Sequence, residues 1–565
     1  MKQICIIALL LPALFATSSA VNADTVISRS AYQDRLRGFW LGSCIANWTG
    51  LQTEGQKVGK PYYTDADWGT NQGRENATID YVLDTEGRDG IWGADDDTDI
   101  EYMYQHAMET YETSKLTGEQ IRDQWLEHID GSYIWVSNET AYYLMRDQGV
   151  IPPATSEPAN NANWEMIDAQ LTTEIFGLFA PANAAVALDI AELPIRTTAF
   201  SHSAYAAQFY VVMYSLASSV DPNLSYQEQT LWLADQARAY IPDDSYIAAM
   251  YDWVRARYLN TNDKDDWESV RDAFHDRYIA GGADGYTYLA FYDAGSNFGF
   301  SIISLLFGEG DYQKTVKIGT LSGQDSDNPT ATWGGLLGFL YGHKGLEDHF
   351  NKDDFSDKYK ISRTRTGFGG DAKSSFDTFD LGTGPVEEYI GYTFDGLRTF
   401  SQVMFQEGVH RRDGGWFADG TLRVQVRQDG SWQDVAAESS PAYPVGNELT
   451  AFGDGFERYT FTLENVVGDG IRLFGNAGGE KPYISVTELE VYADGRNIAS
   501  EGEIVKAAKK KRNVELIRDG VAPMGTGIDT FSALAERGLS VVDRVVTERM
   551  GGTIDGDSWI IPDSQ

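Results

Sequence analysis

The residues that commonly build cross-links, zinc sites and covalent nucleophiles are scarce in this sequence. It has two cysteines and seven histidines among 565 residues. Cys5 lies in an N-terminal segment that we expect to be removed, so Cys44 would have no disulfide partner. The histidines are scattered, which disfavours zinc, and no G-x-S-x-G string indicates a serine nucleophile. We therefore expect the stability of the protein to come from its hydrophobic core.

Basic residues are also few relative to acidic ones. The chain has 45 Lys and Arg against 84 Asp and Glu, a formal net charge of −39. Such an excess of negative charge argues against nucleic acid and against anionic membrane surfaces as partners. It does not indicate disorder, because 42% of the residues are hydrophobic and 13% are aromatic, enough for a sizeable core.

Long apolar runs are missing except at the N-terminus. Lys2 precedes an apolar stretch over 4–15, and small residues follow in ATSSAVNAD. This pattern is typical of a signal peptide cleaved after Ala20 or Ala23, and a buried N-terminal helix is the alternative. We predict a signal peptide over residues 1–23 and a secreted or periplasmic protein. No later segment reaches about 18 consecutive apolar residues, so we expect no membrane span.

Most of the chain from about 27 to 360 has the periodicity of helices. One helix is expected to begin near Ile100, another near Ser201, and a third where Asn297 precedes the apolar run FGFSIISLLFG. Gly38, Gly42 and Ala46 are four residues apart, which places small side chains on one helix face. We predict a mainly α domain over residues 24–374.

The pattern changes to alternation near residue 375. Leu422, Val424 and Val426 alternate with polar residues before an Asp-Gly turn at 429–430. Similar alternation occurs over 459–463 and, after a slip of one residue, over 484–491. These short strands predict an antiparallel β-sandwich of the jelly-roll type over 375–500. Helical periodicity then resumes, so residues 501–565 are expected to return to the helical domain.

The first acidic cluster is ADDDTDIEY, which starts at Ala94. Asp95, Asp96 and Asp97 stand just before the predicted helix at Ile100. One or two of them could simply cap this helix. Three adjacent carboxylates repel one another, and a hard cation is the natural counter-charge.

The second acidic cluster is SGQDSDNPTATWGGLLGFLYG, which starts at Ser322. Asp325, Asp327 and Asn328 precede a helix with glycines at every fourth position. Each glycine costs about 1 kcal/mol relative to alanine in a helix, which is understandable if another backbone approaches closely. If the two acidic helix starts converge, they would form an oxygen-only site for one or two Mg²⁺ ions.

Five motifs together resemble the ADP-ribosylglycohydrolase family, also called dinitrogenase reductase-activating glycohydrolase-like. The resemblance covers roughly residues 30–370 and resumes at 515–563. It implies an all-α fold and a pair of Mg²⁺ ions held between two acidic motifs. The motifs are RLRGFWLGS (35–43), ADDDTD (94–99), EIFGLFAPANAA (174–185), SHSAYAAQF (201–209) and GQDSDNPTATWGGLLG (323–338). Residues 385–495 likewise resemble a discoidin-like, galactose-binding-like β-sandwich, with YIGYTFDG near the start and YISVTELEVYADG at the end.

The resemblance to the hydrolase family implies roles for individual residues. It implies metal ligation by the two acidic motifs, with Asn328 in the place of the usual threonine and Ser43 in the place of the usual aspartate. Glu54 and Asp97 are the predicted catalytic carboxylates, with an exposed loop carboxylate as the alternative for Glu54. Asn183 and His202 are predicted substrate contacts; the alternatives are a loop amide and a core histidine. The predicted metal ligands are Asp95, Asp96, Asp97, Asp325, Asp327 and Asn328.

The family hydrolyses a glycosidic bond at a ribofuranose ring, which implies a glycosidase activity with Mg²⁺ as cofactor. Because the predicted signal peptide exports the chain, we expect an extracellular glycan or glycoside as the substrate, in particular a furanoside. Two alternatives stay open: an ADP-ribosyl-protein hydrolase that releases ADP-ribose, and a non-catalytic carbohydrate-binding protein on the same fold. The sequence leaves the oligomeric state open.

Overall fold

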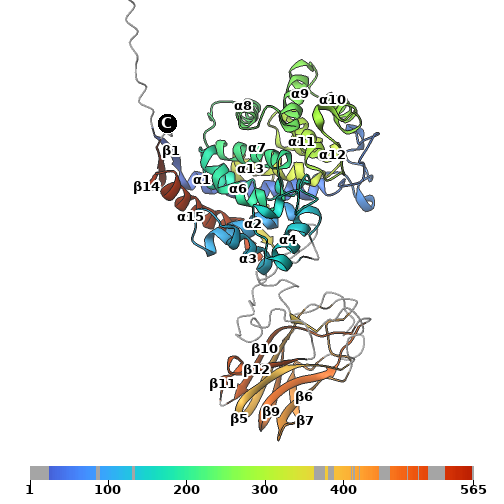
Figure 1. Ribbon diagram of the computed structural model, residues 1–565, viewed down its shortest axis with the longest axis vertical. Coiled ribbons are helices and arrows are strands. Elements are labelled where there is room, and N and C mark those ends of the chain that lie inside the picture. The colour runs from blue at the N-terminus through green and yellow to red at the C-terminus, as the bar shows by residue number, and fades with distance from the viewer. Residues whose placement is uncertain are drawn as a thin grey trace, which may run out of the picture.

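A computed structural model describes the chain in two parts, one helical and one made of strands (Figure 1). The predicted signal peptide, residues 1–23, lies outside the described residues, as do 362–375 and 507–527. The predicted domain boundaries at 374 and 500 stay predictions; β12 (Glu503–Lys506), just after the second of them, still pairs with a strand of the sheet. No helix within the described residues is both long and apolar enough to cross a membrane. The described residues are 24–83, 90–129, 131, 134–361, 376–378, 387–408, 410, 414–418, 420–443, 458–479, 482–493, 495–506 and 528–562.

The predicted mainly α fold is confirmed for the first part of the chain. Helices occupy most of the described residues up to 350, and one further helix follows the strands. They are α1 (Arg29–Gly50), α2 (Asp96–Thr110), α3 (Gly118–His128), α4 (Val136–Gln148), α5 (Ile175–Phe179), α6 (Ala184–Thr198), α7 (His202–Leu216), α8 (Tyr226–Arg238), α9 (Tyr246–Asn260), α10 (Trp267–Phe274), α11 (Ala294–Gly308), α12 (Tyr312–Ser322), α13 (Asp327–Phe350) and α15 (Phe531–Arg549).

Helices α1 and α13 lie side by side at the centre of the helical part (Figure 1). Their backbones touch through glycines: a Cβ on Gly38 would lie 2.2 Å from the Gly338 oxygen, and a Cβ on Gly42 would lie 2.3 Å from the Gly334 oxygen. The glycine spacing seen in the sequence is therefore a backbone-to-backbone contact. It brings the end of α1 beside the start of α13, where Ser326 Oγ donates to the Gly50 carbonyl oxygen at 3.0 Å.

The chain returns to this helical core after the strand region. Phe531 and Leu534 of α15 belong to the same buried cluster as the residues of α1. Two small sheets also join distant parts of the chain, with strand orders β1-β15-β14 and β13-β3-β2. Their strands are β1 (Thr25–Ser28), β2 (Trp92–Gly93), β3 (Lys358–Lys360), β13 (Ile528–Thr530), β14 (Thr553–Asp555) and β15 (Ser558–Ile561).

The strand region is a nine-stranded antiparallel sheet with its own buried core. The two layers of the predicted sandwich are continuous with each other, because two long strands, β5 and β9, run through both; their pairing shifts register between Thr393 and Arg398. The strands are β4 (Phe376–Asp377), β5 (Glu387–Glu407), β6 (Arg423–Gln428), β7 (Ser431–Val435), β8 (Ala437–Ser440), β9 (Arg458–Asn476), β10 (Ser485–Ala493), β11 (Arg496–Asn497) and β12 (Glu503–Lys506).

Local patterns in the sequence are reproduced with small shifts. Asp429 and Gly430 form the turn between β6 and β7, both with positive φ. The slip of one residue in β10 is a register shift between Val486 and Glu488. Helix α2 begins at Asp96 and not near Ile100, because Asp95 caps it. Similarly, Asp293 caps α11, which places Asn297 inside that helix.

The glycine contact between α1 and α13 leads to a stability prediction. Gly338→Ala should lower the free energy of unfolding by about 1–3 kcal/mol, because the added methyl group meets the Gly38 backbone. Gly59→Ala is the matched control, since a Cβ there would meet nothing within 4 Å. Thermal melting followed by circular dichroism measures both variants. Equal melting temperatures for Gly338→Ala and the wild type would contradict the close contact.

A pair of buried carboxyl groups lies between the central helices. Glu101 Oε1 accepts a hydrogen bond from the Ile175 backbone N–H, and Glu174 Oε1 accepts one from the Thr332 hydroxyl at 2.8 Å. Burial raises the pKa of Glu174 to about 8. Burial, together with the charge of Glu174, raises the pKa of Glu101 well above its ordinary value. The folded protein therefore holds protons here that the unfolded chain releases.

This pair predicts a pH-dependent stability. Since the pKa of Glu174 rises from 4.5 to about 8 on folding, the free energy of unfolding should fall as the pH rises through this window. Glu174→Gln keeps an oxygen for Thr332 and cannot ionise. Its free energy of unfolding should therefore exceed that of the wild type by a small amount at pH 5 and by a large amount at pH 9. Urea denaturation at both pH values measures the difference. Glu119→Gln, at an exposed position of α3, is the control. A difference that does not change with pH would refute the prediction.

Candidate active site

Residues of both acidic motifs line one cavity of about 440 Å³. It lies where the end of α1 and the starts of α2 and α13 meet, beside a short 3₁₀ turn, η4 (Ile167–Ala169). The described residues that line it include seven carboxylates and one cation, Arg74. The lining residues are Leu51, Glu54, Arg74, Asp95, Asp96, Asp97, Trp135, Val136, Ile167, Asp168, Leu171, Phe291, Tyr292, Asp325 and Asp327.

The first motif forms one group of three carboxylates, Asp95, Asp96 and Asp97. Asp95 precedes α2 as its N-cap, and its Oδ1 accepts a hydrogen bond from the Asp96 N–H at 3.1 Å. Asp96 and Asp97 are the first two residues of the helix. The helix start thus favours negative charge here through its free N–H groups and its dipole. One oxygen from each of the three carboxylates lies within 4.8 Å of the other two.

Asp97 is held by amide groups from two other helices. Asn47 of α1 donates to its Oδ2 at 3.1 Å, and Asn328 of α13 donates to its Oδ1 at 2.9 Å. Asn328 is not among the residues that line the cavity. The structure therefore gives Asn328 a contact that orients Asp97; its predicted role as a metal ligand stays a prediction.

The second group of three carboxylates combines the second motif with Glu54. Asp325 and Asp327 come from the turn before α13 and its first residue, and Glu54 follows α1. The Glu54 carboxylate accepts a hydrogen bond from Arg74 Nη1 at 2.8 Å, which fixes it at the cavity wall. Asp327 is 5% exposed, and its Oδ1 is buried without a hydrogen bond.

Gln324 joins the segment after Glu54 to the turn that carries Asp325. It is fully buried with a φ of 62°, next to Gly323 with a φ of 81°. Its backbone oxygen accepts from the Gly55 N–H at 2.9 Å. Its side-chain amide donates to the Val58 carbonyl oxygen at 2.9 Å and to Tyr62 Oη at 3.1 Å. These bonds place Glu54 beside Asp325 although they are far apart in the sequence.

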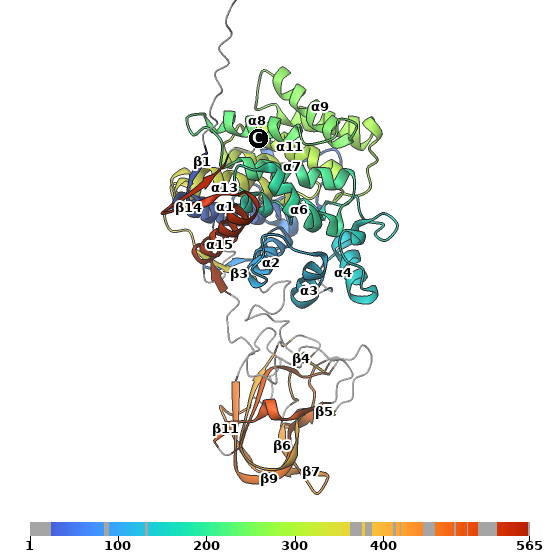
Figure 2. The same ribbon diagram turned by 60° about the vertical axis from the view of Figure 1, so that its left-hand side comes forward.

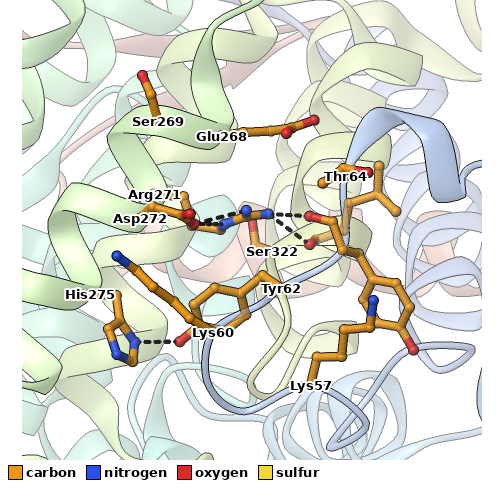
Figure 3. A network of polar contacts seen from close by, with 12 residues as sticks. Lys57, Lys60, Tyr62, Thr64, Glu268, Ser269, Arg271, Asp272, His275 and Ser322 are labelled. Atoms are coloured by element: carbon orange, nitrogen blue, oxygen red, sulfur yellow. Dashed lines mark hydrogen bonds and ion pairs between the residues drawn. The ribbon is translucent and has the colours of Figure 1, made fainter.

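A further polar network, around Arg271, contacts the residues that precede the turn at Gly323 and Gln324 (Figure 3). The Arg271 guanidinium is 2% exposed and donates to the carbonyl oxygens of Tyr63 and Leu321. Tyr62 Oη and His275 Nδ1 are hydrogen-bonded at 2.7 Å. Arg271 thus binds the chain just before Gly323, and Tyr62 binds Gln324 just after it. The turn is therefore held at both of its ends.

The carboxylates of the cavity strongly disfavour one another's ionisation. Burial raises the pKa of Asp97 well above its ordinary value, and the charges of Asp96 and Asp95 raise it further. Burial also raises the pKa of Asp327, together with Glu54 and Asp97. Burial and Asp327 do the same for Asp325. A positive charge in the cavity would relieve this repulsion.

The donor set suits a hard divalent cation. Both groups offer carboxylate oxygens only, and the buried Asp327 Oδ1 makes no other hydrogen bond. Oxygen ligands are those that Mg²⁺ and Ca²⁺ prefer. Two adjacent groups could hold one or two ions, as the sequence predicts.

Asp168 is a cavity carboxylate that sequence reasoning missed. It belongs to η4 and lies in neither group of three. Its Oδ2 accepts a hydrogen bond from the Ser137 hydroxyl, and its Oδ1 accepts one from the Asn138 N–H at 3.4 Å. Burial raises its pKa to about 6. A single aspartate outside any acidic motif gave no signal in the sequence.

An aromatic rim was also missed. Trp135 is 51% exposed at the cavity, and Phe291 and Tyr292 line it with their rings 4.8 Å apart. These aromatic residues come from segments far from the acidic motifs in sequence. Their flat faces give the polar cavity an apolar border.

Asn183 and His202 do not line this cavity. Asn183 caps α6, where its Oδ1 accepts from the Val186 N–H at 3.1 Å. His202 begins α7 and stacks on Tyr246, with ring centroids 4.1 Å apart. The structure therefore assigns both residues contacts within the helical framework, and it does not bring them to the carboxylates.

With this geometry in place, comparison with known proteins identifies the family. Residues 28–363 match the family model described as ADP-ribosylglycohydrolase. The chain belongs to the ADP-ribosylglycohydrolase family. A solved structure described as an ADP-ribosylglycohydrolase-related protein complex is 15% identical; the match covers 56% of this chain and 90% of that one, with a TM-score of 0.38. No curated protein matches the chain.

The role of Gln324 leads to a prediction about metal binding. Gln324→Asn tolerates the positive φ but is too short to reach Val58 and Tyr62, so Glu54 and Asp325 should separate. We expect affinity for Mg²⁺ or Mn²⁺ to fall about tenfold or more, which corresponds to at least about 1.4 kcal/mol. Isothermal titration calorimetry measures this. Gln236→Asn, at an exposed position of α8, is the control. Unchanged metal affinity in the folded Gln324→Asn variant would rule out the positioning role.

Proposed function

We propose that this ADP-ribosylglycohydrolase-family hydrolase is exported and cleaves the glycosidic bond of an extracellular furanoside with the help of one or two Mg²⁺ ions. The observation that carries the proposal is that, among the described residues, seven carboxylates and one cation, Arg74, converge in one cavity. Arg74 already donates to Glu54. The cavity therefore offers oxygen ligands for cations and polar contacts for sugar hydroxyls.

The charge of the cavity favours an uncharged substrate. Even two divalent cations would leave the formal charge of its described lining negative. A diphosphate group would thus meet repulsion, with no basic side chain of the described lining left to bind it. This supports a neutral glycoside over the second candidate, hydrolysis of ADP-ribosyl protein, which the name of the family favours.

The aromatic rim supports a sugar ligand as well. Sugar rings and aromatic aglycones pack with their apolar faces against aromatic side chains. Trp135 is 51% exposed and lines the cavity, as does Phe291. The carboxylates then face the hydroxyl-bearing side of the ring. A five-membered ring with a cis-diol would present two adjacent hydroxyl oxygens to them.

Each carboxylate has a proposed task. The two groups around Asp97 and Asp327 would hold the cations, which when bound would stabilise the charge that develops on the sugar in the transition state. Glu54, fixed by Arg74, would orient the attacking water. Asp168 lies outside both groups, and its Oδ1 has one long hydrogen bond, so this oxygen is available to transfer a proton.

The test is release of sugar from a panel of furanosides and pyranosides, with ADP-ribosylated protein as the competing substrate. We expect turnover of a furanoside, its loss in EDTA, and its loss in Asp325→Ala and Asp327→Ala. Asp168→Asn should lower kcat by about 10²–10⁴-fold while Mg²⁺ affinity stays unchanged. Asp263→Ala, at an exposed position outside the cavity, is the matched control.

Three outcomes would overturn parts of the proposal. Faster release of ADP-ribose than of any sugar would favour the ADP-ribosyl hydrolase. Unchanged activity in EDTA or in Asp327→Ala would refute the metal site. Tight sugar binding with no product would favour a non-catalytic binding protein.

A further inference from the structure

The described lining of the carboxylate cavity has a second part that is almost free of polar atoms. Apart from the seven carboxylates and Arg74, the side chains of this lining are aliphatic or aromatic. The carboxylates serve the cations and the sugar hydroxyls in the proposed reaction, so this second part can contact another group of the substrate. We call it the apolar wall; it consists of Trp135, Val136, Ile167, Leu171, Phe291 and Tyr292.

Hydrogen bonds join the three chain segments that form the apolar wall. The Ile167 N–H donates to the Tyr292 carbonyl oxygen at 3.1 Å. Asp168, the next residue, accepts from the Ser137 hydroxyl and the Asn138 N–H in the first turn of α4. Helix α4 lies beside α3, and α3 beside α2, at one end of the helical part in both views (Figures 1 and 2). The wall is therefore one surface, and Asp168 lies within it.

Trp135 stands at the edge of this wall on a strained backbone. Val136 has a φ of 54°, in the left-handed region that a β-branched residue rarely adopts. Its carbonyl oxygen accepts from the Thr140 hydroxyl at 3.0 Å and from Asn163 Nδ2 at 3.4 Å, and these bonds hold the first turn of α4. Trp135 is the most exposed tryptophan among the described residues. Strain and an exposed indole both cost stability, which is understandable if a ligand covers the ring.

The composition of the wall decides between two kinds of aglycone. A second sugar ring would carry hydroxyl groups, and burying them without hydrogen bonds is costly. The Trp135 indole N–H and the Tyr292 hydroxyl are the only polar side-chain atoms that the described wall offers. An aromatic aglycone needs few such partners. Phe291 and Tyr292, whose ring planes are inclined at 76°, offer it both a ring face and a ring edge.

We propose that the substrate is a furanoside with a flat, uncharged aromatic aglycone, and that Trp135 is the residue that selects this aglycone. The inference rests on the proposed function and narrows its substrate from glycans and glycosides to aromatic glycosides. The sugar would lie at the carboxylate groups around Asp97 and Asp327, and the aglycone against the apolar wall. The bond to be cleaved would then lie beside Asp168, the carboxylate proposed to transfer a proton.

Thioglycosides of ribofuranose, which resist hydrolysis, test the proposal separately from turnover. Isothermal titration calorimetry of the full chain with Mg²⁺ compares benzyl, cyclohexylmethyl, methyl and glucosyl aglycones, each as both anomers. We expect the wild type to bind the benzyl compound at least about tenfold more tightly than the methyl and glucosyl compounds, and about threefold more tightly than the cyclohexylmethyl compound. Trp135→Ala should lose most of this preference, while its affinity for the methyl compound stays unchanged.

Two further variants serve as controls. Trp232→Ala is the matched control, because Trp232 is also exposed and is not among the residues that line the cavity. Trp135→Phe should keep most of the preference, since it retains a flat ring. Melting curves verify that each variant is folded. With hydrolysable benzyl and methyl ribofuranosides, whose leaving alcohols have similar basicity, Trp135→Ala should raise KM for the benzyl compound only.

The outcomes separate the possibilities. Equal affinity for the benzyl and glucosyl compounds would overturn the aromatic aglycone in favour of a glycan, and equal affinity for the benzyl and cyclohexylmethyl compounds would overturn the need for a flat group. An unchanged preference in Trp135→Ala would overturn the role of Trp135. Binding of none of the four compounds would refute the proposed furanoside site, and this inference with it. Sugar release from the furanoside panel without any preference for the aglycone would refute this inference alone.

Discussion

The close contact between α1 and α13 is the constraint on which the rest of the helical part depends. Glycines bring the two backbones so near that an added Cβ would lie 2.2 Å from a carbonyl oxygen. This approach sets the end of α1 beside the start of α13. Both ends carry carboxylates, Glu54 on one side and Asp325 and Asp327 on the other. Without the contact, the second carboxylate group would not assemble.

The carboxylate cavity is an arrangement of like charges that the protein stabilises with indirect contacts. Asn47 and Asn328 donate to Asp97, and Arg74 donates to Glu54. Behind the acidic turn, Gln324 and Arg271 satisfy backbone oxygens. These contacts fix positions without neutralising most of the charge. A divalent cation would relieve the remaining repulsion, so the cavity combines carboxylates in fixed positions with negative charge that the protein itself does not neutralise.

The helical and strand parts differ in how their polar surfaces are built. In the cavity, carboxylates gather around space that is open to a cation. On one face of the strand region, the Arg472 guanidinium lies 4.3 Å from the ring centre of Tyr389 and 4.4 Å from that of Trp432. Asp434 and Glu387 are acidic neighbours of this guanidinium and raise its pKa against the effect of burial.

The sequence by itself determined the helical class, the strand region and the two acidic motifs, because periodicity and clustered carboxylates are local properties of the chain. It also indicated Glu54, which the structure brings to Asp325. Only the tertiary structure decided that Asp168 and Trp135 share this cavity and that Asn183 and His202 do not. These residues carry no local signal: an isolated aspartate or tryptophan resembles any other until folding places it. The capping of α6 by Asn183 and the stacking of His202 on Tyr246 are likewise contacts that depend on the packed helices.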